Sequence, residues 1–205
     1  MILFAVTMVG QVWTGWYVYN DDRQDHGRTP VTLRAYLASG HFGEATFENF
    51  ESEFLQMSFY VVLTVFLYQR GSAESKRPDV IELVDLDPRG SPNRSAPWPV
   101  RRGGFVLRVY QNSLSLAFAA LFVLAFTFHA TTGRIHYNEE RMEHGAAPVT
   151  LTRFMTSSQF WFESLQNWQS EFLSLAAMVT FTIFLRQRGS PESKAVDAPT
   201  WETGH

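Results

Sequence analysis

Two acidic side chains, Glu53 and Glu171, each stand at the entrance of a long uncharged run. The first follows Asn49 in the stretch NFESEFL, and the second follows Asn167 in NWQSEFL. A carboxylate at the edge of a hydrocarbon layer is costly unless it has a partner, so it can serve to bind a proton or a cation. It can equally hydrogen-bond within the helix bundle, with Asn49 or Asn167 four residues away on the same helix face. Both interpretations stay open, and we favour the structural one.

The lengths of the runs set the depth of the two carboxylates. Sixteen uncharged residues separate Glu53 from Arg70, and fourteen separate Glu171 from Arg186. At about 1.5 Å per residue the runs span about 24 and 21 Å, which is shorter than a hydrocarbon core of about 30 Å. In the second run the uncharged residues 164–170 can supply the missing turns, which would place Glu171 inside the outer boundary.

The remaining residues give no motif for catalysis or for a bound cofactor. No nucleophile elbow, zinc-protease helix, dinucleotide-binding loop or phosphate-binding loop occurs in the sequence. His129, His136 and His144 lack the spacing of zinc ligands, and a haem held between helices would need a second intramembrane histidine. The absence of cysteine excludes thiolate sites. We therefore expect no catalytic residue, no metal site, no cofactor and no enzymatic activity.

The distribution of charge indicates an integral membrane protein. Residues 1–20 carry no charged side chain, and neither do residues 111–133. Each run has about the 20 residues that a membrane-spanning helix needs. The first run lacks the basic start and the cleavage pattern of a signal peptide, and it ends in Trp and Tyr, which favour the membrane–water interface. The net charge of −3 argues against a nucleic-acid partner.

The chain contains an internal duplication. Residues 19–76 align with residues 137–194 without a gap, at an offset of 118 and with 27 identities in 58 positions. Each copy reads as an apolar helix, a polar loop, a short amphipathic segment and a second apolar helix that ends at Gly71 or Gly189. The sequence thus predicts an all-α integral membrane fold with four transmembrane helices, arranged as two parallel-oriented two-helix repeats.

The duplication divides the chain into a first repeat (1–76), a linker (77–104), a second repeat (105–194) and a polar tail (195–205). Met1 aligns with Ala119, so the first helix lacks about one and a half of the turns that precede its counterpart. Either the first repeat is naturally shortened or the true start lies upstream, and we favour the second. Thr32 and Thr150 precede Leu-x-x-aromatic patterns that predict short interfacial helices on the outer side. Residues 70–108 and the C-terminal segment together contain eleven basic residues, and the two outer loops contain six. Because basic residues favour the cytoplasmic side, we expect both termini and the linker in the cytoplasm.

The repeated motifs S-x-x-F, N-(F/W)-x-S-E-F-L and Q-R-G-S-x-E-S-K resemble those of a bacterial family of membrane proteins that carries a domain of unknown function. The resemblance covers most of the chain and implies a bacterial inner-membrane protein, but it implies no activity. We expect a non-catalytic scaffold or accessory subunit that contacts the lipid bilayer and forms a homo-oligomer or joins a larger membrane complex. The alternative is an oligomeric proton or cation channel or transporter that uses Glu53 and Glu171.

Overall fold

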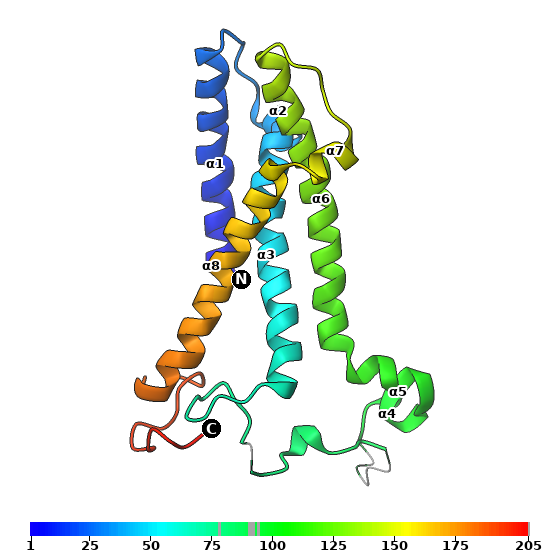
Figure 1. Cartoon of the computed structure of the whole chain (residues 1–205), viewed down its shortest axis with the longest axis vertical. Helices are drawn as coiled ribbons and strands as arrows, with labels where there is room; N and C mark the ends of the chain where they lie inside the picture. The colour runs from blue at the N-terminus through cyan, green and yellow to red at the C-terminus, as the bar shows by residue number, and fades with distance from the viewer. Residues whose placement is uncertain (78, 90–92, 94, 205) are drawn as a thin grey trace. The chain divides into compact units, whose positions relative to one another are not determined.

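The structure is a computed structural model that describes residues 1–77, 79–89, 93 and 95–204, and its regular elements there are all helices. The all-α prediction is therefore confirmed at the level of fold class. Four helices are long (Figure 1): α1 (Ile2–Asp25), α3 (Gly40–Phe66), α6 (Ser113–Glu143) and α8 (Ser158–Phe184). The others are short: α2 (Leu33–Leu37), η1 (Leu83–Asp85), α4 (Trp98–Arg102), α5 (Gly104–Gln111) and α7 (Leu151–Met155).

The helices form two compact units. The first unit consists of Met1–Ser52 and Phe122–Asn167, and the second consists of Glu53–Leu121 and Trp168–His205. Helices α3, α6 and α8 each contribute one part to each unit. Both units therefore draw residues from both halves of the sequence.

The same local contacts recur 118 residues apart. Helices α2 and α7, like α3 and α8, begin and end at that offset. Thr32 and Thr150 each accept a hydrogen bond from the backbone three residues on, which caps the short helices as predicted. Asn20 and Asn138 each bond both backbone groups of a valine eleven residues later, so the same loop is closed in the same way.

The second apolar helix of each half ends earlier than predicted. Helix α3 stops at Phe66 and α8 at Phe184, whereas the glycines with left-handed backbone come later, at Gly71 and Gly189. The reason is a competing acceptor. The backbone N–H of Gln69 donates to the Ser75 hydroxyl, and Gln187 uses Ser193 in the same manner. The serines of the repeated Q-R-G-S-x-E-S-K motif thus take backbone donors that would otherwise extend the helix.

In the first unit, helices α3, α6, α7 and α8 pack through small residues and aromatic rings. A Cβ atom added at Gly43 would lie 2.5 Å from a side-chain carbon of Thr132. The backbone of α3 therefore lies directly against side chains of α6. The buried core centres on Ala130, Phe154 and Phe160. The face of α6 that packs against α3 and α8 is therefore the face that is buried from the surroundings.

In the second unit, the C-terminal tail is attached to the turn that follows α3. The predicted linker 77–104 contains η1 and α4; its residues 78, 90–92 and 94 lie outside the described part, as does residue 205 of the tail. The Gly71 N–H donates to the Thr203 hydroxyl, and the Gly204 N–H donates to the Ser72 carbonyl. The Lys194 ammonium donates to three backbone carbonyls of the tail. The tail predicted as 195–205 is thus folded back on the turn that follows α3.

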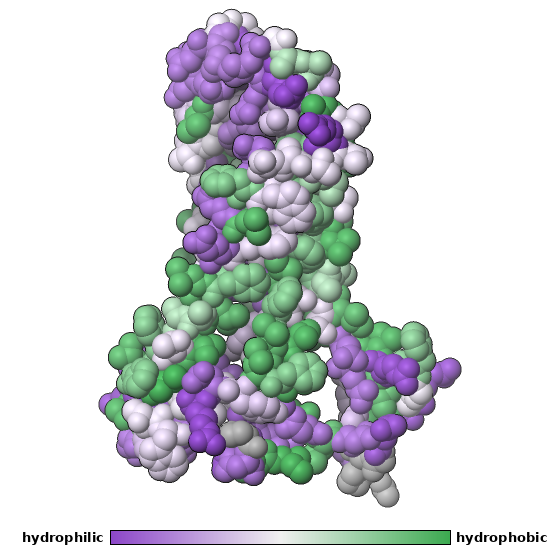
Figure 2. Space-filling model, viewed as in Figure 1, coloured by the Kyte–Doolittle hydropathy of each residue, from purple (hydrophilic) through white to green (hydrophobic). Residues whose placement is uncertain are grey.

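One helix of the described residues, α6, is long and apolar enough to cross a membrane. Its most apolar 18-residue stretch has a mean hydropathy of 1.9, and 17% of that stretch is buried. A core helix of a water-soluble domain would be mostly buried instead. Large apolar side chains are also exposed along α1, and apolar residues cover much of the face drawn in Figure 2.

Substitution of Gly40 by alanine tests the close approach of α3 to α6. The added carbon would lie 2.6 Å from the His136 backbone nitrogen and 2.9 Å from the Thr132 carbonyl oxygen, neither of which can rotate away. We expect Gly40→Ala to destabilise the fold by about 1–3 kcal/mol. The control is Gly10→Ala, because nothing lies within 4 Å of that position and alanine favours a helix by up to about 1 kcal/mol. Equal thermal unfolding midpoints of the two variants in one detergent would contradict the packing.

Candidate functional site

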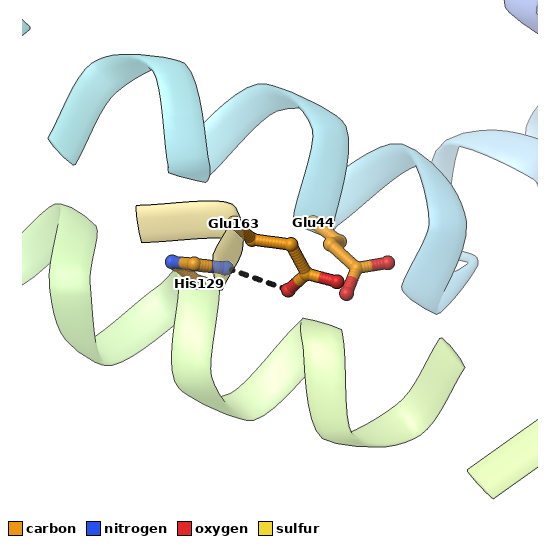
Figure 3. Close-up of side chains that lie close together, drawn as sticks. All are labelled: Glu44, His129 and Glu163. Atoms are coloured by element: carbon orange, nitrogen blue, oxygen red, sulfur yellow. Dashed lines mark ion pairs between the residues drawn. The ribbon is translucent and has the colours of Figure 1, made fainter. Parts of the chain in front are cut away.

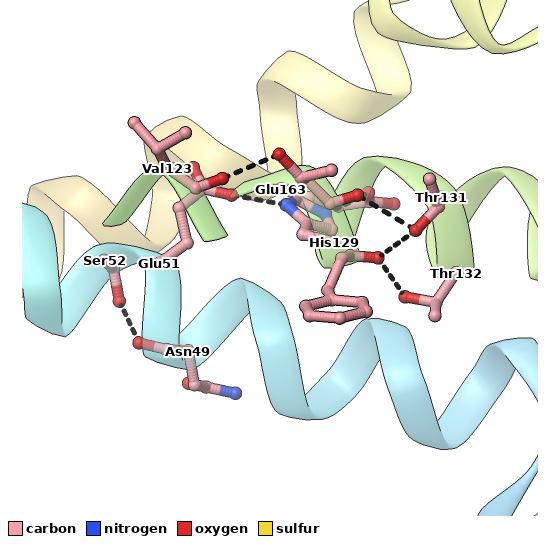
Figure 4. A network of polar contacts seen from close by, with 10 residues as sticks. Asn49, Glu51, Ser52, Val123, His129, Thr131, Thr132 and Glu163 are labelled. Atoms are coloured by element: carbon pink, nitrogen blue, oxygen red, sulfur yellow. Dashed lines mark hydrogen bonds and ion pairs between the residues drawn. The ribbon is translucent and has the colours of Figure 1, made fainter. Parts of the chain in front are cut away.

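A buried imidazole in the first unit forms the centre of a polar cluster. His129 lies in the apolar part of α6, and its Nδ1 is 2.7 Å from Oε2 of Glu51 on α3. Both side chains are completely buried. An ionised carboxylate only accepts hydrogen bonds, so Nδ1 carries the proton of this contact. Figure 4 shows the pair between the helices, with the neighbouring serine and threonine hydroxyls bonded to backbone carbonyls of their own helices.

Small residues on α6 make room for the cluster. The buried positions of that helix are Ala125, His129, Ala130 and Gly133, which fall on one face at helical spacing. A side chain at Gly133 would lie 2.9 Å from Oε1 of Glu44 and 3.1 Å from the Phe154 ring. Gly133 therefore creates the space that the Glu44 carboxylate occupies.

Two further carboxylates approach the other side of the imidazole. His129 Nε2 lies 3.6 Å from Oε2 of Glu163 on α8, and Glu44 on α3 contributes a third oxygen-bearing group. One ligand-type atom from each of Glu44, His129 and Glu163 lies within 4.8 Å of the others. Figure 3 shows the Glu163 carboxylate facing the imidazole, with the Glu44 carboxylate beside that of Glu163. Neither His129 Nε2 nor Glu163 Oε2 makes a hydrogen bond among the described residues.

Aromatic packing holds the imidazole ring in place. The ring stacks on Phe160 with centroids 4.9 Å apart and planes inclined by 28°. Phe160 is itself fully buried and contacts Phe126 and Phe154 edge to face. The contact with Glu51 and the stack on Phe160 together fix both the rotation of the ring and the nitrogen that faces Glu163.

A polar cavity of about 210 Å³ adjoins the cluster. Its walls include Glu44 and Glu163 from the cluster together with Glu48, Glu140 and His136, and it is completed by His41, Ala45, Tyr137 and Gln159. His136 Nε2 lies 3.7 Å from Oε2 of Glu44 and 3.5 Å from Oε1 of Glu140. Four carboxylates thus share one small space with two histidines, and the net potential there favours a cation.

The crowding of acids affects the groups on α3 that precede the span predicted to begin at Glu53. Burial, reinforced by the nearby carboxylates of Glu163 and Glu48, raises the pKa of Glu44 to about 9. Burial also raises the pKa of Glu48. The carboxylates therefore resist simultaneous ionisation while no cation lies between them.

The residues predicted as the site lie outside this cluster. Glu53 is exposed, whereas Glu171 is half-buried and its backbone carbonyl accepts a 2.6 Å hydrogen bond from the Gln56 amide. The Asn49 amide donates to the Ala45 carbonyl rather than to Glu53. Asn167 comes nearest to the cluster, because its side chain hydrogen-bonds Glu48. The Glu53 and Glu171 carboxylates lie close enough to repel each other, whereas Asn49 and Asn167 bond other groups, so the structure brings the two predicted acids together without the two asparagines.

No motif in the sequence points to Glu44, Glu51 or Glu163, and none gives His129 a role. A signal for them was present in the differences between the two halves. At an offset of 118, the counterpart of His129 is Gln11 and that of Glu51 is Gln169. A histidine in the second half and an acid in the first, each opposite a glutamine in the other half and the histidine inside an apolar run, are typical of a buried charged contact.

Within its described residues the chain is thus all-helical, with a helix suited to a membrane and a buried histidine–carboxylate centre. The chain belongs to the family described as domain of unknown function DUF6766, whose pattern matches residues 1–205. No curated protein and no solved structure matches it.

A double-mutant cycle tests the central pair. We expect His129→Gln to destabilise the fold by about 3–5 kcal/mol, because it removes the imidazole from a buried carboxylate. Combining it with Glu51→Gln recreates the neutral residues found at Gln11 and Gln169, so the double variant should be more stable than the sum of the single effects by about 1–3 kcal/mol. The measurement is thermal or denaturant unfolding in one detergent. The control is the exposed Thr127→Val on the same helix, and strict additivity would contradict the contact.

Proposed function

We propose that the protein is a multi-pass membrane protein that acts as a non-catalytic component of a membrane assembly. The observation that carries the proposal is α6, which combines a mean hydropathy of 1.9 with burial of 17% over its most apolar stretch. A surface of that kind is stable against lipid or against another apolar surface. The exposed apolar side chains of α1, including Ile2, Leu3 and Val9, extend the same character to a second helix.

The four-span arrangement is part of this proposal. It is supported by the recurrence of helices and loop contacts at an offset of 118 and by one contact in the second unit. Gln56 donates a 3.0 Å hydrogen bond to Ser174, and these two residues occupy equivalent positions of the two halves. Equivalent residues meet in this way where two copies are related by a two-fold axis. The basic residues of the linker and the C-terminal segment favour placing both termini in the cytoplasm of a bacterial cell.

Conduction of protons or cations is the second candidate function. It is favoured by the hydrogen bond from Gln56 to the Glu171 backbone, which joins α3 and α8 one turn from Glu53. Carboxylates on adjoining helices near the end of a span are a known arrangement for ion and proton pathways. Assembly of several chains would be needed to enclose a pathway, because α3 and α8 of one chain form at most one wall.

Single cysteines test the topology, and the chain suits this method because it has no cysteine of its own. Ser95→Cys lies in the linker, whereas Thr29→Cys and Ala147→Cys lie in the loops after α1 and α6, and all three positions are exposed. In intact cells a membrane-impermeant maleimide should label the two loop positions, and Ser95→Cys should react only after the membrane is opened. Equal labelling of all three in intact cells would contradict the proposed topology.

Charge removal separates the two candidate functions. The variant combining Glu53→Gln and Glu171→Gln should keep its fold and its assembled state in mild detergent, because Glu53 is exposed and the Gln56 bond uses the Glu171 backbone. The measurements are proton and cation flux in liposomes and mass by light scattering. A native protein without flux that migrates as an assembly supports the first function. Flux that is lost in the variant supports conduction, and a lone native monomer without flux contradicts both.

A further inference from the structure

The imidazole at the centre of the cluster has one edge whose hydrogen-bonding capacity is unused. His129 is completely buried, and its Nδ1 forms a hydrogen bond with Glu51. The opposite nitrogen, Nε2, makes no hydrogen bond among the described residues, although two carboxylates face it. A buried ring nitrogen without a hydrogen-bond partner costs free energy. A cation between the nitrogen and the carboxylates removes that cost.

The spacing of the groups fits a metal ion better than it fits a direct contact. The 3.6 Å between His129 Nε2 and Glu163 Oε2 is too long for a hydrogen bond. Two ligands bound to a tetrahedral ion at about 2.1 Å lie about 3.4 Å apart. The Glu44 carboxylate lies within the same 4.8 Å limit, so the three groups surround one point.

We propose that Glu44, His129 and Glu163 bind a divalent transition-metal ion of the Zn²⁺ type and that Glu51 orients the imidazole for it. A carboxylate that accepts the far proton of a ligating histidine fixes its tautomer and increases its basicity. The nitrogen donor favours Zn²⁺ and its neighbours in the first transition row over Mg²⁺ and Ca²⁺, which take oxygen ligands. The absence of thiolates disfavours copper(I). This inference goes beyond the proposed function and does not depend on the number of membrane spans.

The adjoining cavity supplies a route and a free coordination position. Glu44 and Glu163 form part of its wall, and Glu48 and Glu140 add negative charge that attracts a cation. Its volume of about 210 Å³ exceeds the roughly 30 Å³ that one water occupies in the liquid. Three protein ligands leave the fourth position of a tetrahedral ion for water or for an anionic group from outside.

Metal titration of the whole chain in detergent tests the proposal. After treatment with a chelator, the native protein should bind one Zn²⁺ per chain by elemental analysis and should compete with a chromophoric chelator for it. Co²⁺ should give the absorption of a low-symmetry tetrahedral site. The affinity should fall at least 100-fold in His129→Gln and in Glu163→Gln. It should fall about 10–100-fold in Glu51→Gln, which acts through the histidine.

Matched controls separate this site from adventitious binding. His144→Gln removes an exposed histidine just after α6, and Asp21→Asn removes an exposed acid of α1 that does not line the cavity; both should keep the native affinity and stoichiometry. Glu163→Gln lies at the cavity wall and is the variant least expected to disturb folding, so it keeps the test decisive if His129→Gln unfolds. Lack of stoichiometric Zn²⁺ binding by the native chain, or unchanged binding by Glu163→Gln, would overturn the proposal.

Discussion

The contact between His129 and Glu51 is the constraint on which the arrangement of the first unit depends. Removing two ionisable groups from water costs several kcal/mol for each group, and only good geometry and further polar contacts offset that cost. The contact therefore fixes the register of α6 against α3 wherever the unit is folded. Apolar side chains alone would allow neighbouring registers with similar burial, because the hydrophobic effect has no direction.

The small residues of α6 and α3 follow from that constraint. A carboxylate can reach an imidazole across a helix interface only where the backbones approach closely, and Gly43 and Gly133 provide that approach. Phe160 then closes the side of the ring that no polar group covers. The glycines, the buried aromatic ring and the polar pair thus form one packing solution, in which each part requires the others.

The parts of the fold that could be predicted from the sequence depend on short-range contacts. Thr32 caps α2 within three residues, and Asn20 closes its loop within eleven, so both signals lie in one stretch of sequence. Helices α3 and α8 end earlier than their following glycines predict, because serine hydroxyls take the backbone donors first. The cluster could not be predicted in the same way. Glu51 and His129 are 78 residues apart, and their meeting depends on which helix faces pack together.

The duplication explains why the sequence pointed to other acids. Residues that are identical in both halves maintain what both halves share, which is helix boundaries and loop closure. The cluster lies where the halves differ, since His129 and Glu51 stand opposite Gln11 and Gln169 in the alignment. The two glutamines lie in other surroundings, since Gln11 donates to Thr46 and Gln169 is exposed, whereas His129 and Glu51 meet across the two halves and are completely buried. In a duplicated chain, a difference between copies at buried polar positions is therefore a better guide to a site than an identity at exposed ones.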